Sequence, residues 1–66
     1  MYFRRLEDLR TDADKTQEQI AEILNCKREV YRRYEKGTYA IPVWALLKLA
    51  EYYKTSTDYI LGLTND

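Results

Sequence analysis

The sequence has no histidine and a single cysteine, Cys26, among its 66 residues. The absence of histidine excludes histidine-based acid–base chemistry and a metal cluster, and one cysteine cannot form an internal disulfide. Cys26 is either a reactive thiol or a small buried hydrophobe, and the lack of a histidine partner favours the second. No nucleophile stands beside a base and no glycine-rich loop could cradle a phosphate. We therefore expect no enzyme activity, no cofactor and no metal.

Long apolar runs are also missing. No stretch approaches the roughly 18 apolar residues of a membrane span, and no apolar secretory core follows the charges near Met1. We expect a cytoplasmic protein with no membrane contact. A chain of 66 residues makes one small domain, residues 1–66, with a modest core, so function must lie on its surface.

Net charge is absent too, since 11 cations balance 11 anions. This weakens the case for nucleic-acid binding, because domains that bind nucleic acid are usually basic. The distribution of charge matters more. Residues 27–36 contain five cations and two anions, which gives +3, and the rest of the chain carries −3. An acidic body with one basic segment indicates a local electrostatic footprint and little non-specific affinity.

Residues 16–24 have the pattern of a short amphipathic helix. The Thr16 hydroxyl can cap the first turn while Gln19 reaches back, which is the threonine-x-x-glutamine form of the capping box. Asn25 accepts a left-handed conformation more cheaply than most residues, so we expect the helix to end there. The apolar face of this helix consists of Ile20, Ala21, Ile23 and Leu24.

A second short helix is predicted over residues 27–36, with Gly37 placed to stop it. At 100° per residue, Tyr31, Tyr34 and the stem of Lys27 lie on one side, with Val30 and Glu35 at the margins. The opposite arc carries Arg28, Glu29, Arg32, Arg33 and Lys36. Four cations and a carboxylate suit the DNA major groove, where arginine reads guanine and glutamate accepts from cytosine. The pattern also fits a solvated face with a Glu29–Arg33 ion pair, so both interpretations stay open.

Three further helices complete an all-α chain without a strand-length alternating run. The first, about residues 2–13, has an inward face of Phe3, Leu6, Leu9 and Ala13 and a solvated face of Arg4, Arg5, Glu7, Asp8 and Asp12. Arg10 flanks the apolar stripe and could pair with a carboxylate elsewhere.

The helix from Pro42 to about Lys54 is the most apolar and is expected at the centre of the core. Its broad apolar face consists of Leu46, Leu47, Leu49, Ala50 and Tyr53. A last short helix begins near Ser56 or Thr57 as cap and ends at Gly62.

The order and spacing of short motifs resemble the Cro/repressor-type helix-turn-helix family over nearly the whole chain. The resemblance implies a five-helix phage-repressor-like DNA-binding domain, with the helix-turn-helix at about residues 17–36. It favours DNA binding over a merely solvated face. The motifs are Leu9-Arg10, Thr16-Gln17, Ile20-Ala21, Leu24-Asn25, residues 31–37, Ile41-Pro42, Leu49-Ala50 and residues 58–62.

The resemblance also implies a role for individual positions. Base-reading positions of the family fall on Arg28, Glu29 and Arg33, with Arg32 nearby. Phosphate-contacting positions fall on Gln17, Lys27, Lys36 and Thr38. Positions Arg10 and Glu35 form a structural ion pair in similar proteins, and Ala21 is where the two helices approach closely. Trp44 stands where the family is usually polar, and could lie over its own domain, at a dimer contact or against the sugar-phosphate backbone.

Two functions from different classes follow. The first is a transcriptional regulator, as a repressor, that binds double-stranded DNA as a homodimer on a palindromic site. The second is a small protein-interaction module, antitoxin- or antirepressor-like, favoured by the zero net charge and by Tyr39, Trp44 and Leu63 if they are exposed. The last helix and tail, near Ile60 and Leu63, are the candidate dimer surface. Because no sensor domain follows Asp66, we expect no small-molecule ligand.

Overall fold

The computed structural model describes residues 3–64, and within them the chain forms five helices and no strand. The helices are α1 (Arg4–Asp12), α2 (Gln17–Leu24), α3 (Arg28–Lys36), α4 (Val43–Tyr53) and α5 (Thr57–Leu61). The predicted all-α, five-helix architecture is confirmed. The predicted start of the first helix, at Tyr2, lies outside the described residues. None of the helices in the described range is long and apolar enough to cross a membrane.

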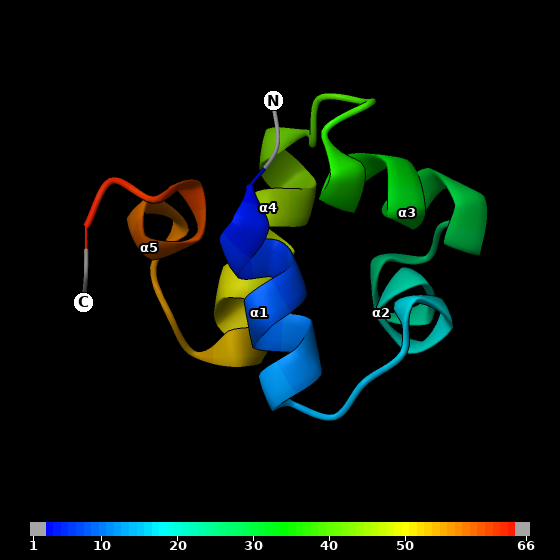
Figure 1. The fold of residues 1–66 in the computed structure, drawn as a ribbon, viewed down its shortest axis with the longest axis horizontal. Coiled ribbons are helices and arrows are strands. Elements are labelled where there is room, and N and C mark those ends of the chain that lie inside the picture. Colours follow the sequence, from blue (N-terminus) through cyan, green and yellow to red (C-terminus); the bar gives the residue numbers. More distant parts are fainter. Residues whose placement is uncertain (1–2, 65–66) are drawn as a thin grey trace.

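The helices surround one core, to which each of them contributes. Helix α1 packs against α3 and α5, and α4 packs against α2 and α5. Figure 1 shows α1 in front of α4, with α5 on one side and the α2–α3 pair on the other. The most deeply buried large side chains are Leu6, Ile20, Leu24, Tyr31, Leu49 and Ile60.

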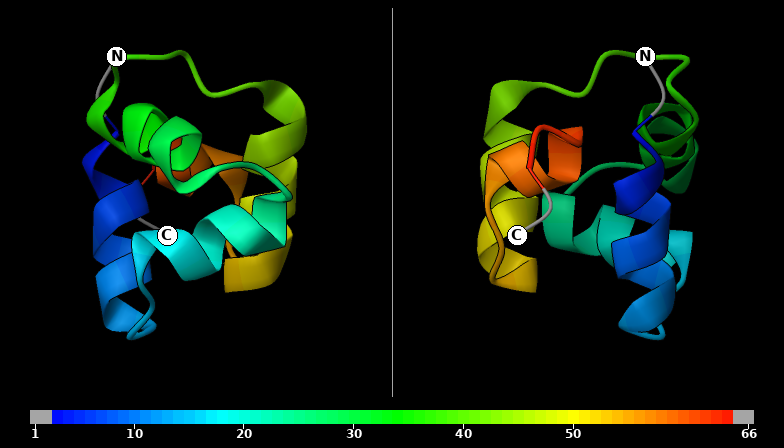
Figure 2. Two further views of the ribbon diagram at one scale, coloured as in Figure 1. Left: turned by 90° about the vertical axis from the view of Figure 1, so that its right-hand side faces the viewer. Right: turned by 60° about the vertical axis from the view of Figure 1, so that its left-hand side comes forward.

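Helices α2 and α3 form one side of the molecule. In the left view of Figure 2 they lie toward the viewer, flanked by α1 and α4. Ala21 on α2 is buried, and its small side chain lets the two helices approach closely. The pair packs on α1 through α3 and on α4 through α2.

Some of the expected burial is wrong. Ala13 is exposed because the last helical residue is Asp12, so Ala13 caps α1 instead of facing inward. Leu47 is 58% exposed, since α4 buries a narrower stripe of Ala45, Leu46, Leu49 and Ala50. Ile60 is 1% exposed, so it belongs to the core and cannot form part of a free dimer surface, whereas Leu63 is 73% exposed.

Arg5, predicted on the solvated face of the first helix, is instead bonded to the C-terminal part of the chain. Its Nη1 donates to the Tyr59 carbonyl at 2.8 Å and to the Thr64 carbonyl. Its Cζ lies 4.3 Å from the centre of the Tyr59 ring, well inside the range of a cation–π contact. Arg5 thus ties α1 to α5 and to the segment after it.

Two helix starts are one residue later than predicted. Lys27 and Pro42 both have extended backbone and are N-caps, so α3 begins at Arg28 and α4 at Val43. The caps predicted for α2 and α5 are confirmed. Thr16 precedes α2, and the Ser56 hydroxyl accepts from the Tyr59 N–H at the start of α5.

Candidate nucleic-acid interface

The first part of the site is the start of α2. The Thr16 hydroxyl accepts from the Gln19 N–H at 3.1 Å, and the Gln19 side chain accepts from the Thr16 N–H at 2.9 Å. This capping box leaves other N–H groups of the first turn unpaired within the helix, and these point outward with the positive end of the helix dipole. An anion is stabilised at such an end.

The turn after α2 sets the angle of α3. Asn25 has φ 57° and ψ 44°, the left-handed conformation expected for it. The Cys26 N–H then donates to the Ala21 carbonyl at 2.9 Å, which closes the end of the helix. Cys26 is partly buried against the core. Burial raises the pKa of its thiol, which favours the structural interpretation over a reactive thiol.

A partly buried ion pair joins α1 to α3. Arg10 Nε donates to Glu35 Oε2 at 2.9 Å, and Arg10 Nη2 donates to Glu35 Oε1 at 3.1 Å. The side chains are 17% and 4% exposed respectively. Arg10 Nη1 also donates to the Lys15 carbonyl at 3.0 Å. A bidentate contact of this kind fixes orientation as well as distance, so the pair holds α3 against α1 and the loop before α2.

Gln17 belongs to the same network. Its Nε2 donates to Glu35 Oε1 at 3.2 Å, so one of its two amide hydrogens is already used. Burial alone would raise the pKa of Glu35, but the hydrogen bonds from Arg10 and Gln17 and the charge of Arg10 outweigh burial and lower it. The buried Tyr31 hydroxyl has no hydrogen-bond partner within the described residues. Glu35 is therefore an ionised structural group.

The outer face of α3 contains the side chains assigned to base reading. Arg28 and Glu29 are exposed, and Arg32 and Arg33 are half-exposed. Glu29 lies 3.7 Å from Arg32 Nη2 and 3.6 Å from Arg33 Nη2. Both contacts are solvent-exposed pairs and contribute a few tenths of a kcal/mol to the helix. The structure thus brings these four side chains onto one face without committing them to the core.

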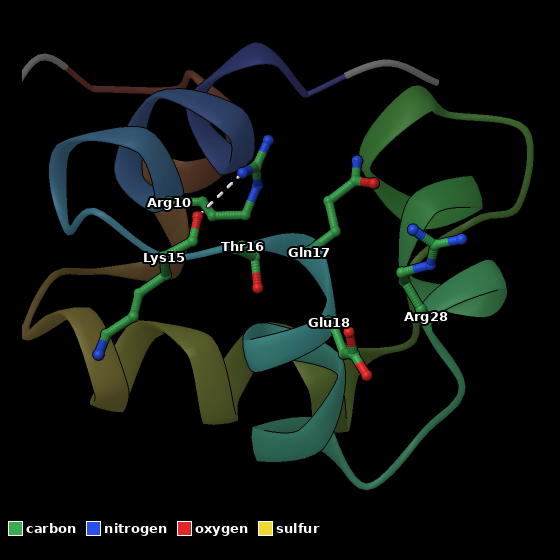
Figure 3. A pocket seen from close by; sticks show the side chains of 6 residues that line it. All are labelled: Arg10, Lys15, Thr16, Gln17, Glu18 and Arg28. Carbon is green, nitrogen blue, oxygen red and sulfur yellow. Dashed lines mark hydrogen bonds between the residues drawn. The ribbon is translucent and has the colours of Figure 1, made fainter.

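The side chains assigned to phosphates lie around that face. Lys27, Lys36 and Thr38 are exposed at the two ends of α3, and Gln17 is half-buried at the start of α2. A hollow of about 460 Å³ separates the starts of α2 and α3 (Figure 3). It is lined by Arg10, Lys15, Thr16, Gln17, Glu18 and Arg28. Glu18 places a carboxylate beside this hollow that the sequence analysis did not assign.

Tyr39 is a contact that sequence reasoning missed. Arg33 Nη1 donates to the Tyr39 hydroxyl at 2.5 Å, and Arg33 Cζ lies 5.0 Å from the ring centre. Tyr39 and Trp44, which were candidate exposed aromatics, are both exposed. The Gly37 stop indicates only that the helix ends there and that the chain changes direction. It does not indicate which side chain the ring will meet.

Comparison with known proteins places the chain in a family. The helix-turn-helix domain profile matches residues 4–59. Over the whole chain, 42% of residues are identical to an uncharacterized HTH-type transcriptional regulator, YobD of Bacillus subtilis, and the match covers 59% of that protein. The HTH-type transcriptional regulator ImmR of B. subtilis is 39% identical over 89% of the chain and 46% of its own length.

A phage repressor and a solved structure of a transcriptional regulator are also similar to this chain. The cryptic phage CTXphi transcriptional repressor RstR of Vibrio cholerae is 34% identical over 80% of the chain and 48% of its own length. The crystal structure of a transcriptional regulator from Listeria innocua superposes with a TM-score of 0.88 at 26% identity, covering all of this chain and 62% of that one. The chain spans about half the length of the curated relatives that it matches. It belongs to the helix-turn-helix domain family of the phage-repressor type, whose members among these relatives are transcriptional regulators and a repressor.

Proposed function

We propose that this chain is the sequence-specific DNA-binding part of a transcriptional repressor, and that α3 reads the major groove of double-stranded DNA. The observation that carries the proposal is the division of α3 into two faces. Its inner face is anchored by buried Tyr31 and by the Arg10–Glu35 pair. Its outer face presents three arginines and one glutamate to solvent. An α-helix fits the major groove, and these side chains match base edges there.

The base-reading roles follow from chemistry. Arg28 and Arg33 are assigned to guanine O6 and N7, the commonest specific contact of arginine. Glu29 is assigned to a cytosine amino group, which requires it to leave its exposed pairs with Arg32 and Arg33. Those pairs are weak in water, so exchanging them for base contacts costs little.

The phosphate roles belong to both ends of the helix pair. The free N–H groups at the start of α2 suit one phosphate, together with the second amide hydrogen of Gln17. Lys27, Lys36 and the chain at Thr38 are assigned to phosphates on either side of the groove. In this arrangement Gln17 links a phosphate to Glu35, so contact with DNA would act on the network that already fixes α3.

We further propose that the protein acts as a homodimer on a palindromic site, with half-sites about 34 Å apart. Dimeric regulators of this type read two successive turns of one DNA face, and a single short α3 reads only a few base pairs. Trp44 and Leu63 are the exposed apolar side chains proposed for the dimer contact. One of the relatives, RstR of Vibrio cholerae, is a transcriptional repressor, which supports the repressor assignment.

Selection of bound sequences from a random duplex pool at moderate salt tests this function. We expect enrichment of a short palindrome, and relaxed preference at one position per half-site in Arg28→Ala and at another in Arg33→Ala. Each substitution should cost about 1–3 kcal/mol, as expected for a lost bidentate contact. Arg4→Ala is the matched control, because Arg4 is an exposed α1 cation paired only weakly with Asp8 at 3.8 Å.

No enrichment, together with weak binding that neither substitution changes, would contradict the proposal. That outcome would favour the protein-interaction alternative, with Trp44, Val43 and Leu47 as the exposed side chains available to a protein partner. Equal effects of Arg4→Ala and Arg28→Ala would reduce the interaction to general electrostatics.

A further inference from the structure

The guanidinium of Arg33 is held from two sides. On one side, Nη1 donates to the Tyr39 hydroxyl at 2.5 Å, and Cζ lies 5.0 Å from the centre of the ring, within the roughly 6 Å reach of a cation–π contact. On the other side, Nη2 lies 3.6 Å from Glu29 Oε2. A side chain assigned to base reading is therefore already oriented before any DNA is bound.

Tyr39 has its own fixed position. After Gly37, whose φ is 81°, the chain turns back, and the Tyr39 N–H donates to the Arg33 carbonyl at 3.2 Å. The ring is 44% exposed and is not among the described side chains that pack against the core. Core packing therefore does not account for its place beside Arg33. The turn after Gly37 therefore brings the Tyr39 ring beside Arg33, the residue whose carbonyl accepts from the Tyr39 N–H.

The two partners of Arg33, Tyr39 and Glu29, differ in which guanidinium N–H groups they leave free for a base. The ring face uses none of the guanidinium hydrogens, and the hydroxyl uses one of the two on Nη1. Glu29 occupies the other end of the fork, and it is shared with Arg32 at 3.7 Å. Contact with Tyr39 is therefore compatible with a bidentate bond from Arg33 to guanine, while contact with Glu29 competes with that bond.

We propose that Tyr39 is a positioning residue that orients Arg33 for guanine. The inference rests on the proposed function and deepens it, because it assigns a residue outside α3 to the specificity of the site. An unrestrained arginine loses much of its rotamer freedom when it contacts a base. A ring that restricts the guanidinium in the free protein removes part of that loss, so binding to the correct base strengthens.

The test compares Tyr39→Leu and Tyr39→Phe with the wild-type chain and with Arg33→Ala on the selected duplex. Tyr39→Leu should weaken binding about threefold to tenfold, from the lost cation–π contact and hydrogen bond. It should relax preference at the base pair that Arg33→Ala relaxes and leave the salt dependence unchanged. Tyr39→Phe should retain part of the effect of the ring. Adding Tyr39→Leu to Arg33→Ala should cost nothing further.

Tyr52→Leu is the matched control, because Tyr52 is a 38% exposed tyrosine on α4. In the free protein, NMR of the arginine guanidinium should show hindered rotation at Arg33 in the wild-type chain and in Tyr52→Leu, and fast rotation in Tyr39→Leu. Fast rotation in the wild-type chain would overturn the inference without reference to DNA.

The DNA experiment separates two failures. If the wild-type chain selects no sequence, the proposed function fails and the inference fails with it. If the wild-type chain selects a sequence and Arg33→Ala relaxes it, but Tyr39→Leu leaves preference intact, the inference alone is wrong. A uniform loss of affinity across sequences with a smaller salt slope would make Tyr39 a phosphate contact, which also overturns its positioning role.

Discussion

Glu35 is the residue on which the placement of α3 depends most. A carboxylate that is 4% exposed is costly unless its charge and its lone pairs are matched. Arg10 supplies two donors and Gln17 a third. Removing one member leaves a buried or half-buried charge uncompensated, so the loss exceeds what the intact pair contributes. The pair is thus a structural device that fixes α3 relative to α1.

Substitution of Glu35 tests this view of the pair. Glu35→Gln should lower the free energy of unfolding by about 3 kcal/mol at pH 7, the low end for breaking a buried pair because Arg10 keeps some solvent contact. Urea denaturation measures the loss. Glu22→Gln, an exposed glutamate on α2, should change stability by less than about 0.5 kcal/mol. Similar losses for the two variants would show that the pair contributes nothing special.

The lowered pKa of Glu35 predicts how this loss depends on pH. Since the folded pKa lies below the ordinary value of 4.5, the carboxylate stabilises the fold fully above about pH 4.5. That stabilisation disappears as pH falls through the lower folded pKa. Stability curves of the wild-type chain and Glu35→Gln should therefore converge in acid. Parallel curves from pH 7 to pH 2 would contradict the assignment of the shift to Glu35.

The sequence predicts which side chains share a face of α3 better than it predicts their partners in other elements. Helical periodicity places Arg28, Glu29, Arg32 and Arg33 on one arc, because side-chain direction within a helix is fixed by position. Glu35 is placed only at a margin, and its partner Arg10 comes from a resemblance. Tyr39 cannot be paired with Arg33 from periodicity, since the path of a loop is set by tertiary contacts.

Helix ends explain which elements could be located from the sequence. Each of the five helices is followed within two residues by a left-handed residue, and these are Asp14, Asn25, Gly37, Lys54 and Gly62. The two glycines and the asparagine are recognisable stops, because such residues adopt positive φ cheaply. Lys54 carries no such signal, and the helix was therefore predicted to extend through it. The structure ends α4 at Tyr53 and places Lys54 at φ 56°.

Glycine substitution at two of these ends should give different results. Lys54→Gly should stabilise the fold by up to about 1 kcal/mol, because relief of a side chain in the left-handed region outweighs the entropy of an added glycine. Asn25→Gly should be near neutral, since asparagine already tolerates that region. Thermal or urea unfolding measures both. A loss of stability in Lys54→Gly would show that the Lys54 side chain makes a stabilising contact that outweighs backbone strain.

At the scale of the whole molecule, charge is arranged rather than accumulated. The chain has no net charge, and its cations concentrate on α3, on the side of the molecule formed with α2 (Figure 2). The fold itself follows from the sequence because each helix has its own apolar period, and α2, α4 and α5 also have a start signal in Thr16, Pro42 and Ser56. The dimer surface does not follow, since exposure is decided by the packing of all five helices. Ile60 illustrates this, because it was predicted to lie at the dimer surface and is buried in the core.

This arrangement predicts a modest salt dependence that individual lysines set. Each phosphate contact contributes about −0.9 to the slope of log affinity against log salt. Lys36→Gln should therefore reduce the slope by about 1 and weaken binding to all sequences alike, whereas Arg28→Ala should relax preference. Lys48→Gln is the matched control, because it removes an exposed lysine on α4 and gives the same net charge as Lys36→Gln. It should leave the slope unchanged. Fluorescence anisotropy at several salt concentrations, on the selected and on random duplexes, measures these slopes.

If both lysine variants lower the slope equally, the field of the whole molecule governs binding and Lys36 makes no phosphate contact of its own. If only Lys36→Gln does, a molecule of zero net charge binds DNA through a few placed cations, and its acidic remainder keeps affinity for random sequence low.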